Sequence, residues 1–141
     1  MPFKTTSRDL VRTYQAFDIC SSRHIRSFGL TSSQFDVIAT LGNQSEMTIK
    51  ELTSNTLITK GTMTGVIRRL EKQGLINKRV NESDARSQFV KITLKGQALF
   101  ESIFPDQMSH LKVAFDKLTP KELIDLSALL QTLKHALETP R

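Results

Sequence analysis

The chain has 141 residues, a length that fits one domain whose hydrophobic core needs no covalent staples. Hydrophobic residues make up 38% of it, yet no apolar run approaches the length of a membrane span, so we expect no membrane partner. A single cysteine rules out an internal disulfide framework and favours the reducing cytoplasm. The formal net charge is +6, and residues 45–96 carry most of the excess, with ten Lys/Arg against five Asp/Glu. Such a surface either attracts a polyanion, with nucleic acid as the leading candidate, or is only a solvated basic face.

Helical periodicity predicts a first helix over residues 7–28, ended by Gly29. Val11 and Ile19 lie off its main apolar stripe, which indicates burial against more than one neighbour. The stripe itself consists of Leu10, Tyr14, Phe17, His24 and Phe28.

Three capping boxes mark further helix starts, because in S/T-x-x-E/Q the two side chains satisfy amides that would otherwise lack partners. These boxes begin at Thr31, Thr48 and Thr119. They predict helices over residues 32–41, 49–56 and 120–137, with Pro120 at a first helical position, where its missing N–H costs nothing.

A fourth helix is predicted over residues 61–73, with Gly74 as its C-cap. Alternating apolar residues then predict two strands, 75–80 and 88–94, which form a hairpin with a polar tip at residues 81–88. A fifth helix follows over residues 95–115. Pro105 lies inside it, so a kink or break is expected there.

The last helix carries leucines at alternating spacings of three and four, which is a heptad seam too short to stand alone as a coiled coil. Such a seam serves either as intramolecular core or, with the two-sided first helix, as a dimerisation bundle. The seam consists of Leu123, Leu126, Leu130, Leu133 and Leu137.

The fourth helix has one apolar and one cationic face. Met63, Val66, Ile67 and Leu70 define the inward face, and Gly61, Thr64, Gly65, Arg68 and Lys72 lie on the other side. Two glycines inside a helix cost about 1 kcal/mol each relative to Ala, which close approach to another surface would offset. Hydroxyls and Arg68 suit phosphates and base edges, so we predict that this face enters a DNA major groove; the alternative is a tolerated exposed face.

The short turn at residues 55–59 places the third and fourth helices in helix-turn-helix order. Thr48 and Lys50, near the start of the third helix, are candidates for holding a phosphate. At the hairpin tip, Arg86 is placed to enter a narrow minor groove, and Asp84 is placed to orient its guanidinium by a bidentate pair.

Three motifs in this chain carry a family resemblance. The hairpin reads Asp84-x-Arg86-Ser87-x-x-Val90-x-Ile92-Thr93-x-x-Gly96, the preceding link reads Leu70-Glu71-x-x-Gly74-Leu75-Ile76-x-x-Arg79, and an upstream segment reads Leu30-Thr31-x-x-Gln34-Phe35-x-Val37-Ile38. Over about residues 8–137 the chain resembles the MarR family of bacterial transcriptional regulators. Many relatives have a basic residue where this chain has Gly65, so the operator sequence is not transferable from them.

The resemblance implies a mainly α fold with a small β-hairpin wing, that is, a winged helix-turn-helix in a single domain over residues 1–141. About residues 31–96 would bind DNA, and about residues 7–28 and 97–137 would form the dimerisation helices. It implies a cytoplasmic, nucleoid-associated homodimer, expected to be a repressor at a pseudo-palindromic operator. We predict DNA contacts from Thr48, Lys50, Thr59, Lys60, Gly61, Thr62, Thr64, Gly65, Arg68, Lys72, Arg79, Asp84 and Arg86. Predicted dimer contacts are Leu10, Phe17, Leu126, Leu130, Leu133 and Leu137.

Many relatives release DNA when a small anionic or phenolic compound binds, but no motif here identifies an effector. His24 is a candidate contact, with a partly buried structural histidine as the plainer interpretation. Cys20 raises a thiol-controlled alternative because one branch of the family senses hydroperoxides through a cysteine in its first helix. That branch places its cysteine nearer the N-terminus. In this chain Cys20 borders an apolar stripe, where cysteine commonly acts as a small hydrophobe.

Catalysis is not indicated by any motif. Three scattered histidines and one cysteine give no metal-ligand spacing, and the sequence has no phosphate-cradling glycine loop or nucleophile motif. We therefore expect neither an enzyme nor a cofactor. A different class of function stays open, in which a winged helix presents its basic face to an acidic protein partner. Strong preference for one duplex sequence over random DNA would distinguish the regulator from this interaction module.

Overall fold

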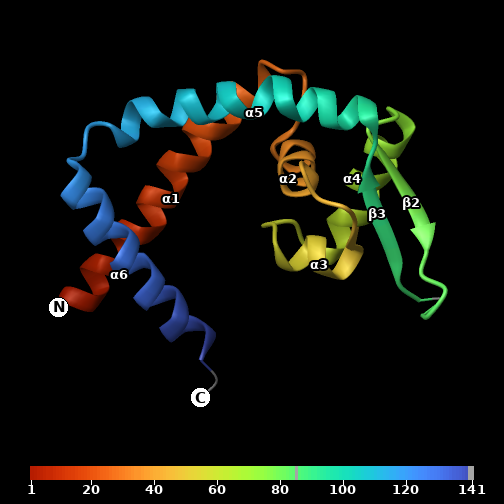
Figure 1. Ribbon diagram of the computed structural model, residues 1–141. Helices are drawn as coiled ribbons and strands as arrows, with labels where there is room; N and C mark the ends of the chain where they lie inside the picture. Colours follow the sequence, from red (N-terminus) through yellow and green to blue (C-terminus); the bar gives the residue numbers. More distant parts are fainter. Residues whose placement is uncertain (85, 140–141) are drawn as a thin grey trace. The chain divides into compact units, whose positions relative to one another are not determined.

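The computed structural model describes residues 1–84 and 86–139 as six helices and three strands (Figure 1). In chain order these are α1 (Pro2–Arg26), α2 (Ser32–Leu41), β1 (Met47–Thr48), α3 (Ile49–Ser54), α4 (Lys60–Lys72), β2 (Ile76–Val80), β3 (Gln88–Ile92), α5 (Leu94–Phe115) and α6 (Pro120–Glu138). The fold is mainly helical with a small antiparallel sheet, as the sequence predicts.

All three predicted capping boxes are present. The hydroxyls of Thr31, Thr48 and Thr119 each accept a hydrogen bond, at 3.1 Å, from the backbone N–H three residues later. The side chain at that third position accepts the reciprocal bond from the N-cap N–H in each case. These local bonds fix the starts of α2, α3 and α6 at the predicted residues.

Other boundaries differ from the sequence predictions. α1 begins at Pro2, where the proline occupies a first-turn position, five residues before the predicted start. α3 ends at Ser54, two residues early. α5 continues through Pro105, so no break occurs there. Buried Ile103 and Gln107 flank that proline, and their packing holds the helix despite the lost N–H.

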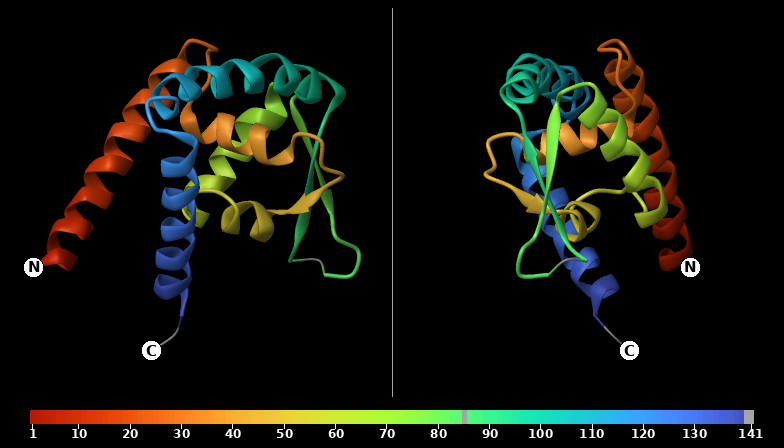
Figure 2. Two further views of the ribbon diagram at one scale, coloured as in Figure 1. Left: turned by 60° about the vertical axis from the view of Figure 1, so that its left-hand side comes forward. Right: turned by 90° about the vertical axis from the view of Figure 1, so that its right-hand side faces the viewer.

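β1 is absent from the sequence predictions, because two residues are too short to show alternation. It pairs with β3 through Met47↔Val90 and Thr48↔Phe89. β2 pairs with β3 from Ile76↔Ile92 to Val80↔Gln88, which gives the sheet order β1-β3-β2. The β2–β3 hairpin is the predicted wing, and its connecting loop lies at the far end of the strands from the start of α5 (Figure 2).

The main hydrophobic core lies among α2, α3, α4 and the inner face of the sheet. Its fully buried side chains include Ile38 of α2, Leu52 of α3, Met63 and Leu70 of α4, and Val90 of β3. The predicted inward face of α4 is confirmed, since Met63, Val66, Ile67 and Leu70 are all buried. This core fixes the angle between the two helices of the helix-turn-helix and leaves the opposite face of α4 outward.

A second, smaller cluster and a polar junction attach α1 to α5. Gln107 of α5 is 1% exposed, and its Oε1 lies 2.7 Å from Nδ1 of His24, while its amide donates to Oγ of Ser21 at 2.9 Å. The His24 ring also meets Phe28 edge-on. His24 is therefore a partly buried histidine with structural contacts, consistent with the plainer interpretation.

The chain divides into two compact units after Gln107. The first unit holds α1 to α4, the sheet and the first part of α5. The second holds the end of α5 and α6. In the described part of the chain, no helix is long and apolar enough to cross a membrane.

Candidate nucleic-acid interface

The outward face of α4 presents the residues predicted for groove entry. Thr64, Arg68 and Lys72 are exposed, as are Thr59, Lys60 and Thr62 at the start of the helix. A Cβ built at Gly61 or Gly65 would meet no heavy atom of the described residues within 4 Å. The two glycines therefore serve no internal packing need, and they leave a shallow strip beside Arg68.

The N-terminus of α4 differs from those of α2, α3 and α6. Within the described residues, no side chain caps it: Oγ1 of Thr59 lies 3.1 Å from Oγ1 of Thr62 and not at a backbone N–H. Lys60, the first residue of α4, is exposed at this uncapped end, where the helix dipole is positive. Such an end favours an anion, and DNA phosphate is the anion that the surrounding cations suit.

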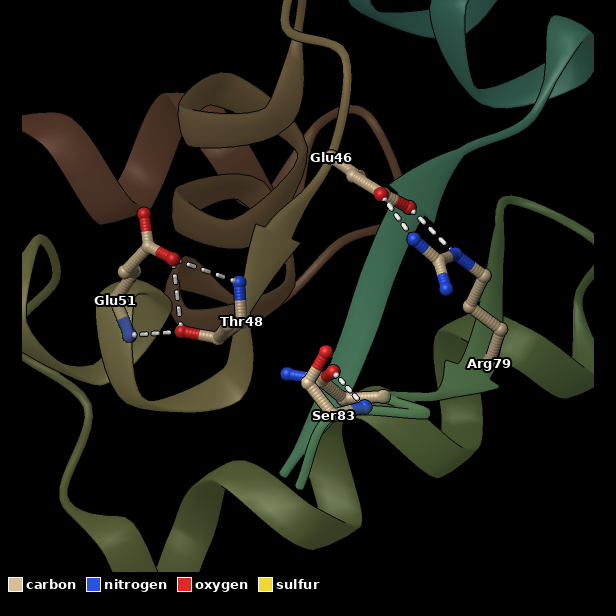
Figure 3. Close-up of polar contacts among 6 residues, drawn as sticks. Glu46, Thr48, Glu51, Arg79 and Ser83 are labelled. Carbon is tan, nitrogen blue, oxygen red and sulfur yellow. Dashed lines mark hydrogen bonds and ion pairs between the residues drawn. The ribbon is translucent and has the colours of Figure 1, made fainter. Parts of the chain in front are cut away.

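Thr48 is committed to its capping box. Its hydroxyl donates to Oε1 of Glu51 at 2.9 Å and accepts from the Glu51 N–H at 3.1 Å (Figure 3). These bonds fix the start of α3, from which Lys50 projects. Lys50 is exposed, as the phosphate-binding prediction requires. A DNA contact from Thr48 itself stays a prediction.

At the wing tip, Arg86 extends into solvent with 95% of its side chain exposed. The Asp84 carboxylate accepts a hydrogen bond from the Arg86 backbone N–H at 3.0 Å and lies 3.6 Å from Nε. The predicted bidentate pair is therefore wrong. Arg86 lies only two positions after Asp84, and at this spacing the short Asp84 side chain reaches the Arg86 backbone N–H, as in an Asx turn, while Nε stays beyond hydrogen-bond distance.

A recess of about 730 Å³ joins α3, the start of α4 and the wing. Three of the predicted DNA-binding cations line it, each from a different element: Lys50, Lys60 and Arg86. Thr53 and Ser54 of α3 add hydroxyls. The tertiary structure thus gathers positive charge and hydrogen-bond donors, separated by up to 36 positions in the sequence, on one concave surface. This combination suits a phosphate backbone.

Arg79, predicted to contact DNA, has internal partners. Its Nε donates to Oε2 of Glu46 at 2.9 Å, and its Nη2 pairs with Oε1 of the same carboxylate. The guanidinium carbon lies 4.4 Å from the centroid of the Phe89 ring. Hydrogen bonding from Arg79 lowers the pKa of Glu46 from its ordinary value. Glu46 was not among the predicted site residues, since no local sequence pattern links it to a residue on β2.

Asp36 is a second residue near the site that no sequence motif indicates. It lies on α2, half-buried, where its carboxylate accepts a hydrogen bond from the backbone of Leu57 in the turn between α3 and α4. Burial raises the pKa of Asp36, and the Leu57 bond lowers it by a smaller amount. The turn of the helix-turn-helix is thus held from α2.

The predicted dimer contacts are apolar side chains that remain at least partly exposed within their own compact unit. Leu10 and Phe17 on α1 are 39% and 43% exposed. No side chain of α6, whose residues are all described, is buried. Within the second unit, Leu126 and Leu130 line a groove of about 320 Å³ together with Phe115 and Leu123. Leu137 is exposed and Leu133 half-buried. Among the described residues, no cluster of His, Cys, Asp or Glu is arranged to hold a metal ion.

A helix-turn-helix, an outward helix face and a basic hairpin define a winged helix-turn-helix protein. Residues 30–88 match the MarR family model. The chain is 27% identical over 114 residues to the HTH-type transcriptional regulator MhqR of Bacillus subtilis, covering 81% of this chain and 79% of MhqR. It also resembles the solved structure of Bordetella bronchiseptica BpsR, with 28% identity, a TM-score of 0.80 and 91% of each chain covered.

A second similar structure is Sco3205 from Streptomyces coelicolor, a MarR family regulator solved in complex with DNA. Its TM-score is 0.86 at 21% identity, covering 96% of this chain and 88% of Sco3205, which is a likeness of fold. The chain thus carries a MarR family match at residues 30–88 and is similar over most of its length to HTH-type transcriptional regulators.

Proposed function

We propose that this regulator is a homodimeric repressor that binds a pseudo-palindromic operator, with α4 in the major groove and Arg86 in the adjacent minor groove. The observation that carries the proposal is the recess shared by Lys50, Lys60 and Arg86, because it links α3, α4 and the wing into one cationic surface. A duplex lying along that surface meets all three elements at once. Phosphate contacts from Lys50 and Lys60 would then position the protein.

Base recognition is assigned to the outward face of α4. Arg68 is the long donor on that face, and a guanidinium pairs well with O6 and N7 of guanine. Gly61 and Gly65 allow the helix backbone to approach the base edges closely, since nothing projects from those positions. Thr64 supplies a hydroxyl and a methyl group at the same depth.

Dimerisation is assigned to α1 and α6, including Leu10, Phe17, Leu126, Leu130, Leu133 and Leu137. Exposed apolar side chains at heptad spacing need a partner surface, and a second copy provides one by symmetry. In such a dimer two α4 helices reach successive major grooves, so half-site centres lie about 10 bp apart.

We further propose a small-molecule effector that releases the operator. The published structure of BpsR concerns regulation of its DNA binding by 6-hydroxynicotinic acid, and BpsR is 28% identical to this chain. The compound recognised by this chain has no assignment. Thiol control through Cys20 is the alternative; peroxide-induced DNA release that is the same in wild type and Cys20→Ser would eliminate it.

The test is selection of a preferred duplex from a random library, followed by measurement of its affinity relative to random DNA. We expect preference for a two-fold symmetric sequence by a factor of about 10³ or more at physiological salt, and protection of two half-sites about 10 bp apart. Binding that depends on salt but not on sequence would instead favour a basic face that meets other acidic partners.

A further inference from the structure

We propose that Arg79 is a positioning residue: its guanidinium, held by Glu46 and Phe89, sets the wing relative to the helix-turn-helix and does not contact DNA. This inference rests on the proposed role of the wing in DNA binding. The inference gives Arg79 a different role from the other cations of the basic segment. It also means that an acidic residue, Glu46, supports the binding of DNA, which is itself an anion.

The geometry spans all three strands of the sheet. Arg79 lies on β2, and Phe89 is its direct partner on the central strand β3. Glu46 immediately precedes β1 on the other side of β3. The Arg79 guanidinium lies over the Phe89 ring on the outer face of β3. It ends in a two-point contact with the Glu46 carboxylate (Figure 3).

The position of Glu46 allows this contact to link the wing to the helix-turn-helix. β1 contributes only two register pairs to the sheet, a weak connection between the wing and the chain that follows. Thr48, the second residue of β1, is also the N-cap of α3. The contact between Arg79 and Glu46, called the clamp below, thus lies two residues before the N-cap of α3, where the helix-turn-helix starts. At the other end, β2 and β3 lead to the wing tip with Arg86.

The contact has the features that distinguish a specific ion pair from an ordinary surface pair. Both carboxylate oxygens and two guanidinium nitrogens take part, a fork that lysine cannot reproduce. The Phe89 ring restricts the guanidinium plane further. Nε and Nη2 of Arg79 are bonded to Glu46, so the guanidinium points along the sheet face toward β1. It is not directed toward the recess, which neither it nor Glu46 lines.

The first test uses the sign of a charge change. Removing a negative charge from a DNA-binding protein normally leaves affinity unchanged or raises it, so a loss in Glu46→Gln would identify positioning. We expect Glu46→Gln to weaken binding to the selected operator duplex by about fivefold, and Arg79→Lys, which keeps the charge, to weaken it similarly. The matched control is Glu82→Gln, the same charge change at an exposed site in the hairpin loop, which we expect not to weaken binding.

The second test asks whether the clamp acts through the wing. In an Arg86→Ala background, Glu46→Gln should have little further effect, because the contact that the clamp positions is already gone. An equal loss in both backgrounds would mean that Glu46 supports the whole fold, and would overturn the proposal. Unfolding by urea, followed for each variant, provides the independent measure of fold stability.

Other outcomes also decide the matter. Arg79 would be a direct phosphate contact if Glu46→Gln and Arg79→Lys both bind with wild-type affinity and Arg79→Gln binds more weakly. In that case the slope of log affinity against log salt should also fall by about one in Arg79→Gln. Loss of affinity in Arg86→Ala with none in Glu46→Gln would overturn the clamp and leave the proposed function intact. No loss in Arg86→Ala would remove the minor-groove contact and the clamp together.

Discussion

The Asp84 carboxylate accepts a hydrogen bond from the backbone N–H of Arg86 at 3.0 Å, at the tip of the wing. Asp84 thereby shapes the loop from which Arg86 projects, and the Arg86 side chain itself stays 95% exposed. A long cation on a braced loop loses less conformational freedom on entering a groove than one on an unbraced loop. The role of Asp84 is thus to position the Arg86 backbone.

Arg86→Ala should reduce operator affinity about tenfold and lower the slope of log affinity against log salt by about one, because one groove contact is lost. Fluorescence anisotropy titrations at several salt concentrations measure both quantities. The fold should be unaffected, since the side chain is exposed. An unchanged isotherm at physiological salt would refute the minor-groove role.

Arg68→Ala should cost about 1–3 kcal/mol of binding free energy and relax specificity at one base-pair position, if Arg68 reads a base. Comparison of the variant on operators with single base-pair changes measures that relaxation. Lys117→Ala, which removes an exposed cation outside the proposed interface, is the control. Equal affinity of wild type and Arg68→Ala for the operator would remove Arg68 from the site.

Gly65→Ala should have opposite effects on stability and on binding. An added Cβ meets no described atom within 4 Å, so the free energy of unfolding should rise by about 1 kcal/mol through helix propensity. Operator affinity should fall, because the methyl group occupies space needed for close approach. Urea unfolding and operator titration of the same preparation test both parts, and unimpaired binding would contradict the close approach.

Gly96→Ala provides the contrasting glycine. There a Cβ would lie 2.1 Å from the Leu75 carbonyl oxygen and 2.7 Å from Ile92, both in the interior between the sheet and α5. We expect the free energy of unfolding to fall by about 1–3 kcal/mol from overpacking. A variant as stable as wild type would show that this junction accommodates the methyl group.

Asp36→Asn should stabilise the fold at neutral pH and not in acid. Burial raises the folded pKa of Asp36 above its ordinary value of 3.8, so the neutral acid folds more favourably than the carboxylate. The contribution of Asp36 to stability is therefore full below that value and lost as the pH rises through the raised pKa. An asparagine stays neutral and still accepts the Leu57 bond. Urea unfolding of both proteins across this pH range should show the advantage appear with rising pH; a constant difference would contradict it.

Leu130→Asp should convert the dimer to monomer and abolish high-affinity operator binding, because a carboxylate would be buried against the second copy. Sedimentation velocity measures the oligomeric state. Ile124→Asp is the matched control, since Ile124 is 70% exposed on the opposite side of α6. Dissociation by both substitutions alike, or by neither, would argue against the heptad seam as the interface.

Local sequence patterns were enough to predict the features that depend on neighbours within a turn or two: the capped starts of α2, α3 and α6, the inward face of α4, and the hairpin. Capping bonds, helical period and strand alternation all act over a few residues, so they can be inferred without knowing where distant segments lie. The motifs also predicted the resemblance to the MarR family that the family model supports, because they combine several such local patterns in a fixed order.

The pairing of distant polar groups follows from the packing of the folded chain and has no local sequence signal. β1 exists because β3 lies beside it, since two residues have no strand tendency of their own. Arg79 pairs with Glu46, 33 residues away in the sequence, and Asp36 accepts a hydrogen bond from the Leu57 backbone. Both contacts form because the core brings α2 and the three strands together. From the sequence, Arg79 is one cation among ten in a basic segment. Its bonding in the fold separates it from Lys50, Lys60 and Arg86, which the same packing gathers around one recess.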